Sequence, residues 1–153
     1  MKYRPVTKII VSLAMGPSLV RVGTLATVKR SIYFEYEPSF LESGIEISPF
    51  RLPLKAGTFQ AKPEPFEGLF GVFNDSLPDG WGRLLLDRSL KSIGISPEEL
   101  SPLDRLTHVG SAGMGAMLFE PDVSEKVTKP GKRKRSFKNY SSYPALPPGH
   151  AQK

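Results

Sequence analysis

The side chains that could perform chemistry are few in this sequence of 153 residues. It contains two histidines, His108 and His150, and no cysteine. A structural or catalytic metal site normally needs three or four His, Cys or acidic ligands at defined spacings, and neither histidine belongs to such a set. We therefore interpret His108 as a surface or helix-end residue and expect no metal site.

Covalent catalysis and phosphoryl transfer also lack their usual residues. A nucleophilic serine needs an adjacent base, and no such motif accompanies His108. The glycine-rich stretch Gly110–Gly115 could offer backbone amides to an anion, but no P-loop lysine follows it, and a tight turn before a strand explains it better. A kinase would need an ATP-binding lysine, a catalytic aspartate and metal ligands on a two-lobed body. We therefore expect no catalytic residue, no cofactor and no enzymatic activity.

One stretch, Phe73–Arg88, stands out because it contains the only tryptophan of the chain. Trp81 lies between Gly80 and Gly82, directly after a turn, where small neighbours leave its ring open to contact. A rigid aromatic ring with an arginine nearby, here Arg83, has the composition of a hot spot in a protein interface. The stretch is therefore the predicted contact surface for another protein.

The residues around the tryptophan allow two interpretations each. Trp81 could instead fold back to cap the core over Phe73. Asn74 and Asp75 could contact a partner or simply cap the end of the preceding helix. Asp79 is predicted to be the N-cap of the next helix, because its carboxylate can accept a hydrogen bond from a free backbone amide. The predicted partner-binding residues are Asn74, Asp75, Asp79, Gly80, Trp81, Gly82 and Arg83.

The elements that position this stretch can be predicted from periodicity and turn residues. Alternating apolar residues predict strands over residues 7–14, 19–26, 31–36, 50–54 and 116–119. Helical spacing or helix-start signals predict helical segments over residues 38–42, 66–73, 80–93 and 103–109. Within the third of these, Leu86, Leu90 and Ile93, widened by Leu85, form an apolar stripe. The sequence therefore predicts an α+β fold, a small antiparallel sheet of about five strands packed against two to four short helices.

The charge of the chain is distributed unevenly. Residues 1–122 hold 13 Lys and Arg against 14 Asp and Glu, whereas residues 123–153 hold 8 against a single Glu. We predict a folded domain over residues 1–122 and a basic, Pro- and Ser-rich, disordered tail over residues 123–153, because the tail lacks apolar periodicity. The nearly neutral domain argues against direct DNA binding.

The compartment follows from cysteine usage and hydropathy. A chain without cysteine has no disulfide scaffold, which favours the reducing cytoplasm. The apolar run over residues 9–13 is too short for a signal peptide, and no stretch is long enough to span a bilayer. We expect a soluble cytoplasmic protein without a membrane partner.

A series of short motifs, in the same order, resembles the small N-terminal domain of HipA-type serine/threonine toxin kinases. The motifs extend over about residues 7–120 and comprise Val22–Leu25, Phe34–Tyr36 with Phe40-Leu41, Ile47–Leu54, Phe73–Gly80, Asp104–Leu106 and Gly110–Ala116. In HipA proteins a much larger kinase core follows this domain and holds ATP and the catalytic residues. That core is missing from this sequence.

The stand-alone domain resembles HipS of the split HipBST arrangement, in which the kinase toxin HipT and the helix-turn-helix protein HipB are separate chains. The resemblance implies an antitoxin-like protein that binds a HipT- or HipA-type kinase and holds it inactive, with a HipB-like DNA-binding protein as a further partner. The alternative is a truncated HipA fragment with a structural role only and no regulatory activity. Nucleic-acid binding through the basic run Lys129–Arg135 is a third, less favoured interpretation.

Overall fold

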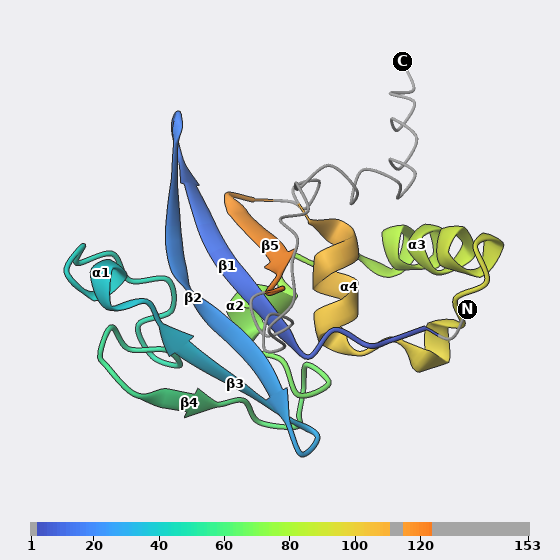
Figure 1. Ribbon diagram of the computed structural model, residues 1–153, viewed down its shortest axis with the longest axis horizontal. Coiled ribbons are helices and arrows are strands. Elements are labelled where there is room, and N and C mark those ends of the chain that lie inside the picture. Colours follow the sequence, from blue (N-terminus) through green and yellow to red (C-terminus); the bar gives the residue numbers. More distant parts are fainter. Residues whose placement is uncertain (1–2, 111–114, 124–153) are drawn as a thin grey trace, which may run out of the picture. The chain divides into compact units, whose positions relative to one another are not determined.

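A computed structural model describes residues 3–110 and 115–123 of the protein. Ser111–Met114, most of the basic tail and the run Lys129–Arg135 lie outside the described residues. The elements in chain order are β1 (Lys8–Met15), β2 (Ser18–Val28), β3 (Ser31–Tyr36), α1 (Pro38–Leu41), β4 (Thr58–Gln60), α2 (Gly71–Asn74), α3 (Gly80–Ser92), the 3₁₀ turn η1 (Pro97–Glu99), α4 (Pro102–Val109) and β5 (Met117–Pro121) (Figure 1).

The strands form one antiparallel sheet in the order β4-β3-β2-β1-β5. Two tight turns connect its three central strands. Gly16, between β1 and β2, has a φ of 59°, and Lys29 and Arg30, between β2 and β3, have φ values of 47° and 68°. Positive φ in a two-residue turn matches the right-handed twist of the strands on either side, so these turns favour hairpins.

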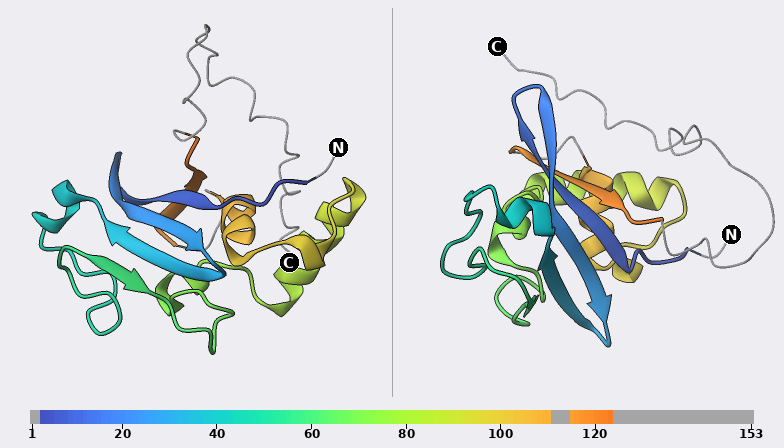
Figure 2. Two further views of the ribbon diagram at one scale, coloured as in Figure 1. Left: turned by 60° about the horizontal axis from the view of Figure 1, so that its bottom comes forward. Right: turned by 60° about the vertical axis from the view of Figure 1, so that its left-hand side comes forward.

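The main hydrophobic core lies between one face of the sheet and helices α2 and α4 (Figure 2). Phe34 of β3 and Phe73 of α2 have ring centroids 5.1 Å apart, and Phe119 of β5 meets Phe73 edge-on at 6.3 Å. Gly23 of β2 lies against Phe34, and an added Cβ there would come within 2.7 Å of the Phe34 Cζ atom. The ring of Phe34 therefore requires a glycine on the neighbouring strand.

Helix α4 is fixed to the N-terminal segment through a buried carboxylate. Asp104 is fully buried and accepts hydrogen bonds from the backbone amides of Val6 and Ser101, both at 2.7 Å. The Ser101 side chain accepts in return from the Asp104 amide, which completes a capping box at the start of the helix. The helix predicted over residues 103–109 is confirmed and begins one residue earlier, at Pro102.

Helix α3 lies outside the main core and, in Figure 1, projects on the side of α4 away from β1. Its two buried side chains, Leu86 and Leu90, form a second and smaller cluster with Leu100. Tyr3 and Ile95 are half-buried against this cluster. The helix therefore has a small core of its own.

The predicted fold class is confirmed, since the described residues form a five-stranded antiparallel sheet and four short α-helices in an α+β arrangement. The strand predicted over residues 50–54 is wrong, and the fourth strand is β4. Phe50 is 97% exposed whereas Leu52 is fully buried, although two such residues would share one face of a strand. The region contributes a single isolated bridge between Ser48 and Leu52.

The helix predicted over residues 66–73 is also wrong, because only the last three of these residues are helical, as part of α2. Glu67 and Gly68 have φ values of 53° and 83°, which a right-handed helix cannot accommodate. The predicted apolar stripe of α3 is correct for its two central leucines and wrong for Leu85 and Ile93, which are exposed. These two residues lie outside the narrow contact that α3 makes with its own cluster.

Candidate protein-binding site

The segment Phe73–Arg88 runs from the end of α2 through a turn into α3. Phe73 anchors its start in the main core, where it is fully buried. Asn74 is the last residue of α2 and is half-buried, and Asp75 is the C-cap, whose backbone amide donates to the Gly71 carbonyl oxygen at 2.9 Å. The helix therefore ends through backbone hydrogen bonds, and the carboxylate of Asp75 lies at the surface.

The turn places Asp79 at the N-cap of α3, as the sequence predicts. Its Oδ1 atom accepts from the Gly82 amide at 3.1 Å, and its carbonyl oxygen accepts from the Arg83 amide at 2.7 Å. An added Cβ at Gly82 would lie 2.7 Å from the Cβ of Pro78, whereas one at Gly80 would meet nothing within 4 Å. Gly82 thus allows the turn to pack closely, and Gly80 is open to solvent.

Trp81 lies on the surface of the first turn of α3, with 66% of its area exposed. The alternative in which it caps the core over Phe73 is wrong. Three other rings contact Phe73 instead, those of Phe34, Phe70 and Phe119. The largest aromatic side chain of the protein therefore contributes little to the buried core.

Arg83 takes part in an ion-pair network within the chain. Its Nη2 atom lies 3.2 Å from Oε1 of Glu67, and the second oxygen of that carboxylate lies 3.8 Å from Nη1 of Arg105 on α4. Glu67 thereby connects the loop before α2 with two helices. Because Arg83 and Glu67 are partly exposed, water and salt screen their attraction, and the pair positions α3 more than it stabilises the fold.

Two leucines beside Trp81 were not among the predicted contact residues. Leu84 and Leu85 follow it by three and four positions and have 40% and 44% of their areas exposed. Residues at these spacings lie on the same side of a helix, so the signal was present in the sequence. It was obscured because Leu85 also fitted the stripe of predicted core residues.

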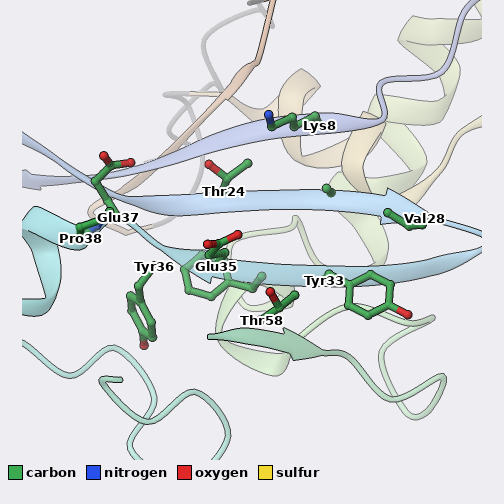
Figure 3. Close-up of a pocket in the computed structure, with 11 residues that line it drawn as sticks. Lys8, Thr24, Val28, Tyr33, Glu35, Tyr36, Glu37, Pro38 and Thr58 are labelled. Atoms are coloured by element: carbon green, nitrogen blue, oxygen red, sulfur yellow. The ribbon is translucent and has the colours of Figure 1, made fainter. Parts of the chain in front are cut away.

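A shallow hollow of about 480 Å³ on the other face of the sheet is a second candidate (Figure 3). Its side chains come from four neighbouring strands and include Lys8, Thr24, Tyr33 and Thr58. Among the residues that the structure describes, no group of three His, Cys, Asp or Glu side chains could hold a metal ion. The hydroxyl and charged groups of the hollow are dispersed, so the hollow is a weaker candidate for a binding site than the surface of α3.

His108 lies in the last turn of α4, as predicted for a helix-end residue. Burial lowers its pKa, and the charge of Asp104 offsets only part of that effect. The imidazole is therefore neutral at pH 7.

The geometry can be compared with known proteins. A family model described as the HipA N-terminal domain matches residues 18–120 and thus includes the whole of α3. No curated protein and no solved structure matches the chain. Over residues 3–110 and 115–123, none of the helices is long and apolar enough to cross a membrane. The chain belongs to the HipA N-terminal domain family.

Proposed function

We propose that this protein is an antitoxin-like inhibitor that binds a separate serine/threonine kinase of the HipT or HipA type in the cytoplasm. The family match concerns the N-terminal domain and not a kinase core, which supports a role in binding a kinase rather than in catalysis. A HipB-like helix-turn-helix DNA-binding protein is the further partner that we propose for a larger complex.

The single observation that carries this proposal is the exposure of Trp81. A tryptophan ring is costly to leave in water, and exposed apolar side chains that adjoin one another on a soluble domain commonly mark an interaction site. Here 66% of the surface of Trp81 is exposed, and the residue is held at the start of a helix whose N-cap is satisfied. The ring is therefore well placed to serve as an anchor residue.

The test is coexpression with a HipT-type kinase from the same genome, followed by copurification and an autophosphorylation assay with and without this chain. We expect a stable complex and loss of autophosphorylation. Trp81→Ala should weaken the complex while leaving the domain folded. Phe50→Ala is the matched control, because Phe50 is also an exposed aromatic residue but lies far along the chain from α3. Failure of the wild-type chain to bind or inhibit the kinase would instead support the fragment with a structural role only.

A further inference from the structure

Helix α3 has two faces of different character. Leu86 and Leu90 point into the small cluster with Leu100 and are buried. Trp81, Leu84, Leu85 and Arg88 follow the spacing i, i+3, i+4 and i+7, which places them together on the roughly opposite side of the helix. All four of these residues are exposed. The helix thus presents an outward face, defined by these four residues, that the fold itself does not use.

The inward side holds α3 in a fixed orientation. The Asp79 side chain caps its first turn, and the ion pair from Arg83 to Glu67 holds the flank of the helix between the leucine cluster and Leu85. The outward face is therefore presented by a helix that is already formed, which lowers the entropic cost of binding.

The charges around the outward face are separated along the helix axis. The carboxylate of Asp79 lies at the N-terminal end and Asp75 lies in the turn that precedes it, and both residues are exposed. The cationic side chains of Arg88 and Lys91 lie towards the C-terminal end and are also exposed. A surface that complements this arrangement must be basic at one end and acidic at the other, with an apolar middle.

We propose that α3 docks lengthwise into an apolar groove on the kinase. The anchors are Trp81, Leu84 and Leu85. Basic residues of the groove lie beside the start of α3 and acidic residues beside its end. This proposal rests on the proposed function and adds the binding mode, the further contact residues and the direction of the helix. Amphipathic helices are commonly recognised in this way, with anchors at i, i+3, i+4 and i+7.

A groove fits the outward face better than a second copy of the same chain does. Two α3 helices placed side by side would share one narrow strip with three apolar residues from each chain. A stable dimer usually buries roughly 800 Å² on each partner, which a single pair of short helices does not provide. A groove contacts both flanks of the helix and therefore reaches the charged residues at its two ends.

The first test measures the affinity of the kinase for the double variant Leu84→Ser/Leu85→Ser by biolayer interferometry. We expect a loss of about 30-fold or more, as is typical of hot-spot residues. The matched control is Leu19→Ser in the β1–β2 hairpin, where a leucine is 57% exposed, and it should bind like the wild type. Both variants should keep the wild-type melting temperature, because the substituted side chains are exposed.

The outcomes separate this inference from the proposed function. If the wild-type chain binds the kinase and the double variant binds equally well, the docking mode is overturned and the inhibitor function stands. If the wild-type chain does not bind the kinase, both are overturned. If light scattering shows a wild-type dimer that the double variant abolishes, the outward face belongs to a second copy and the kinase is the wrong occupant.

The second test concerns the direction of the helix. Asp75→Lys and Arg88→Glu reverse one charge at each end, and each should slow association by about tenfold at low ionic strength. The effect should shrink at high salt, because exposed charges are screened. Glu42→Lys, which reverses an exposed charge just after α1, is the control. Unchanged association of both variants at low salt would overturn the proposed orientation.

Discussion

Two regions of this domain bury apolar side chains in different ways. Under the sheet, aromatic rings from β3, α2 and β5 contact one another from several directions. At α3, three leucines form a small cluster, and the one tryptophan lies outside it. Local stability follows the number of buried apolar contacts, so α3 should open more readily than the sheet. The sheet thus determines the fold, and α3 is a less stable element with its largest side chain available for binding.

The strongest test of this comparison removes the central ring of the sheet core. Phe73 is fully buried between three other phenylalanines, so Phe73→Ala leaves a cavity and should lower the free energy of unfolding by about 3–5 kcal/mol. Urea denaturation monitored by circular dichroism measures the change. Phe50→Ala, at a residue 97% exposed, should change it by less than about 0.5 kcal/mol. Equal effects of the two substitutions would contradict the assignment of this core.

The corresponding truncation at α3 should act locally. Leu86→Ala removes one of three leucines from the small cluster and should destabilise α3 by about 2 kcal/mol. Amide hydrogen exchange should then accelerate over residues 80–92 and remain unchanged in β1, β2 and β3. Leu84→Ala on the outward face is the matched control and should leave exchange at its wild-type rate. Faster exchange throughout the sheet would show that α3 and the sheet unfold as one unit.

The two regions also differ in how well the sequence predicts them. The strands β1, β2 and β3 were predicted to within two residues at each end, because alternation and turn residues agree there. The start of α3 was predicted because Asp79 is a strong N-cap signal. The apolar spacing of residues 66–73 predicts a helix that the structure does not contain. The helix is prevented by the positive φ of Glu67, and the sequence gives no sign of it because this conformation is uncommon for a glutamate.

The candidate site was predictable in part. The position of Trp81 between two glycines identified the segment, and the structure places the ring at the surface. The pairing of Arg83 with Glu67 joins residues 16 positions apart in sequence, and no local pattern indicates it. The exposure of Leu85 depends on which side of α3 meets Leu100, which is again a tertiary contact. Long-range packing therefore decides which side chains of the segment are free to bind.

The buried hydroxyl group of Tyr36 makes the stability of the sheet region depend on pH. The Tyr36 hydroxyl donates to the Leu52 carbonyl oxygen at 2.6 Å, and burial, with a smaller contribution from the charge of Glu46, raises the pKa of Tyr36 to about 12. The unfolded chain loses this proton near pH 10, whereas the folded protein retains it, so stability falls as the pH rises from 10 to 12. At pH 11 the loss should be about 1.4 kcal/mol relative to pH 9.

Tyr36→Phe isolates this contribution from those of other groups that titrate in alkali. The variant is less stable at pH 9, because the Leu52 carbonyl loses its donor, but its stability should fall less between pH 9 and pH 11. Urea denaturation at the two pH values gives the difference. An equal fall in the wild type and the variant would mean that Tyr36 is not buried as the structure shows.

The smallest expected effect concerns the cap of α3. Asp79→Ala removes the acceptor for the Gly82 amide and should destabilise the helix by about 1 kcal/mol, whereas Asp79→Asn keeps an acceptor oxygen and should restore most of that loss. Ser101→Ala at α4 is the informative comparison, because it removes a cap of the same kind from a helix packed on the main core. Asp79→Ala should increase amide hydrogen exchange in α3, whose cluster is small, whereas Ser101→Ala should leave α4 protected by its buried leucines. Equal changes in hydrogen exchange in the two helices would mean that α3 is held as firmly as the sheet core. The division of the domain into a stable part and a binding part would then not hold.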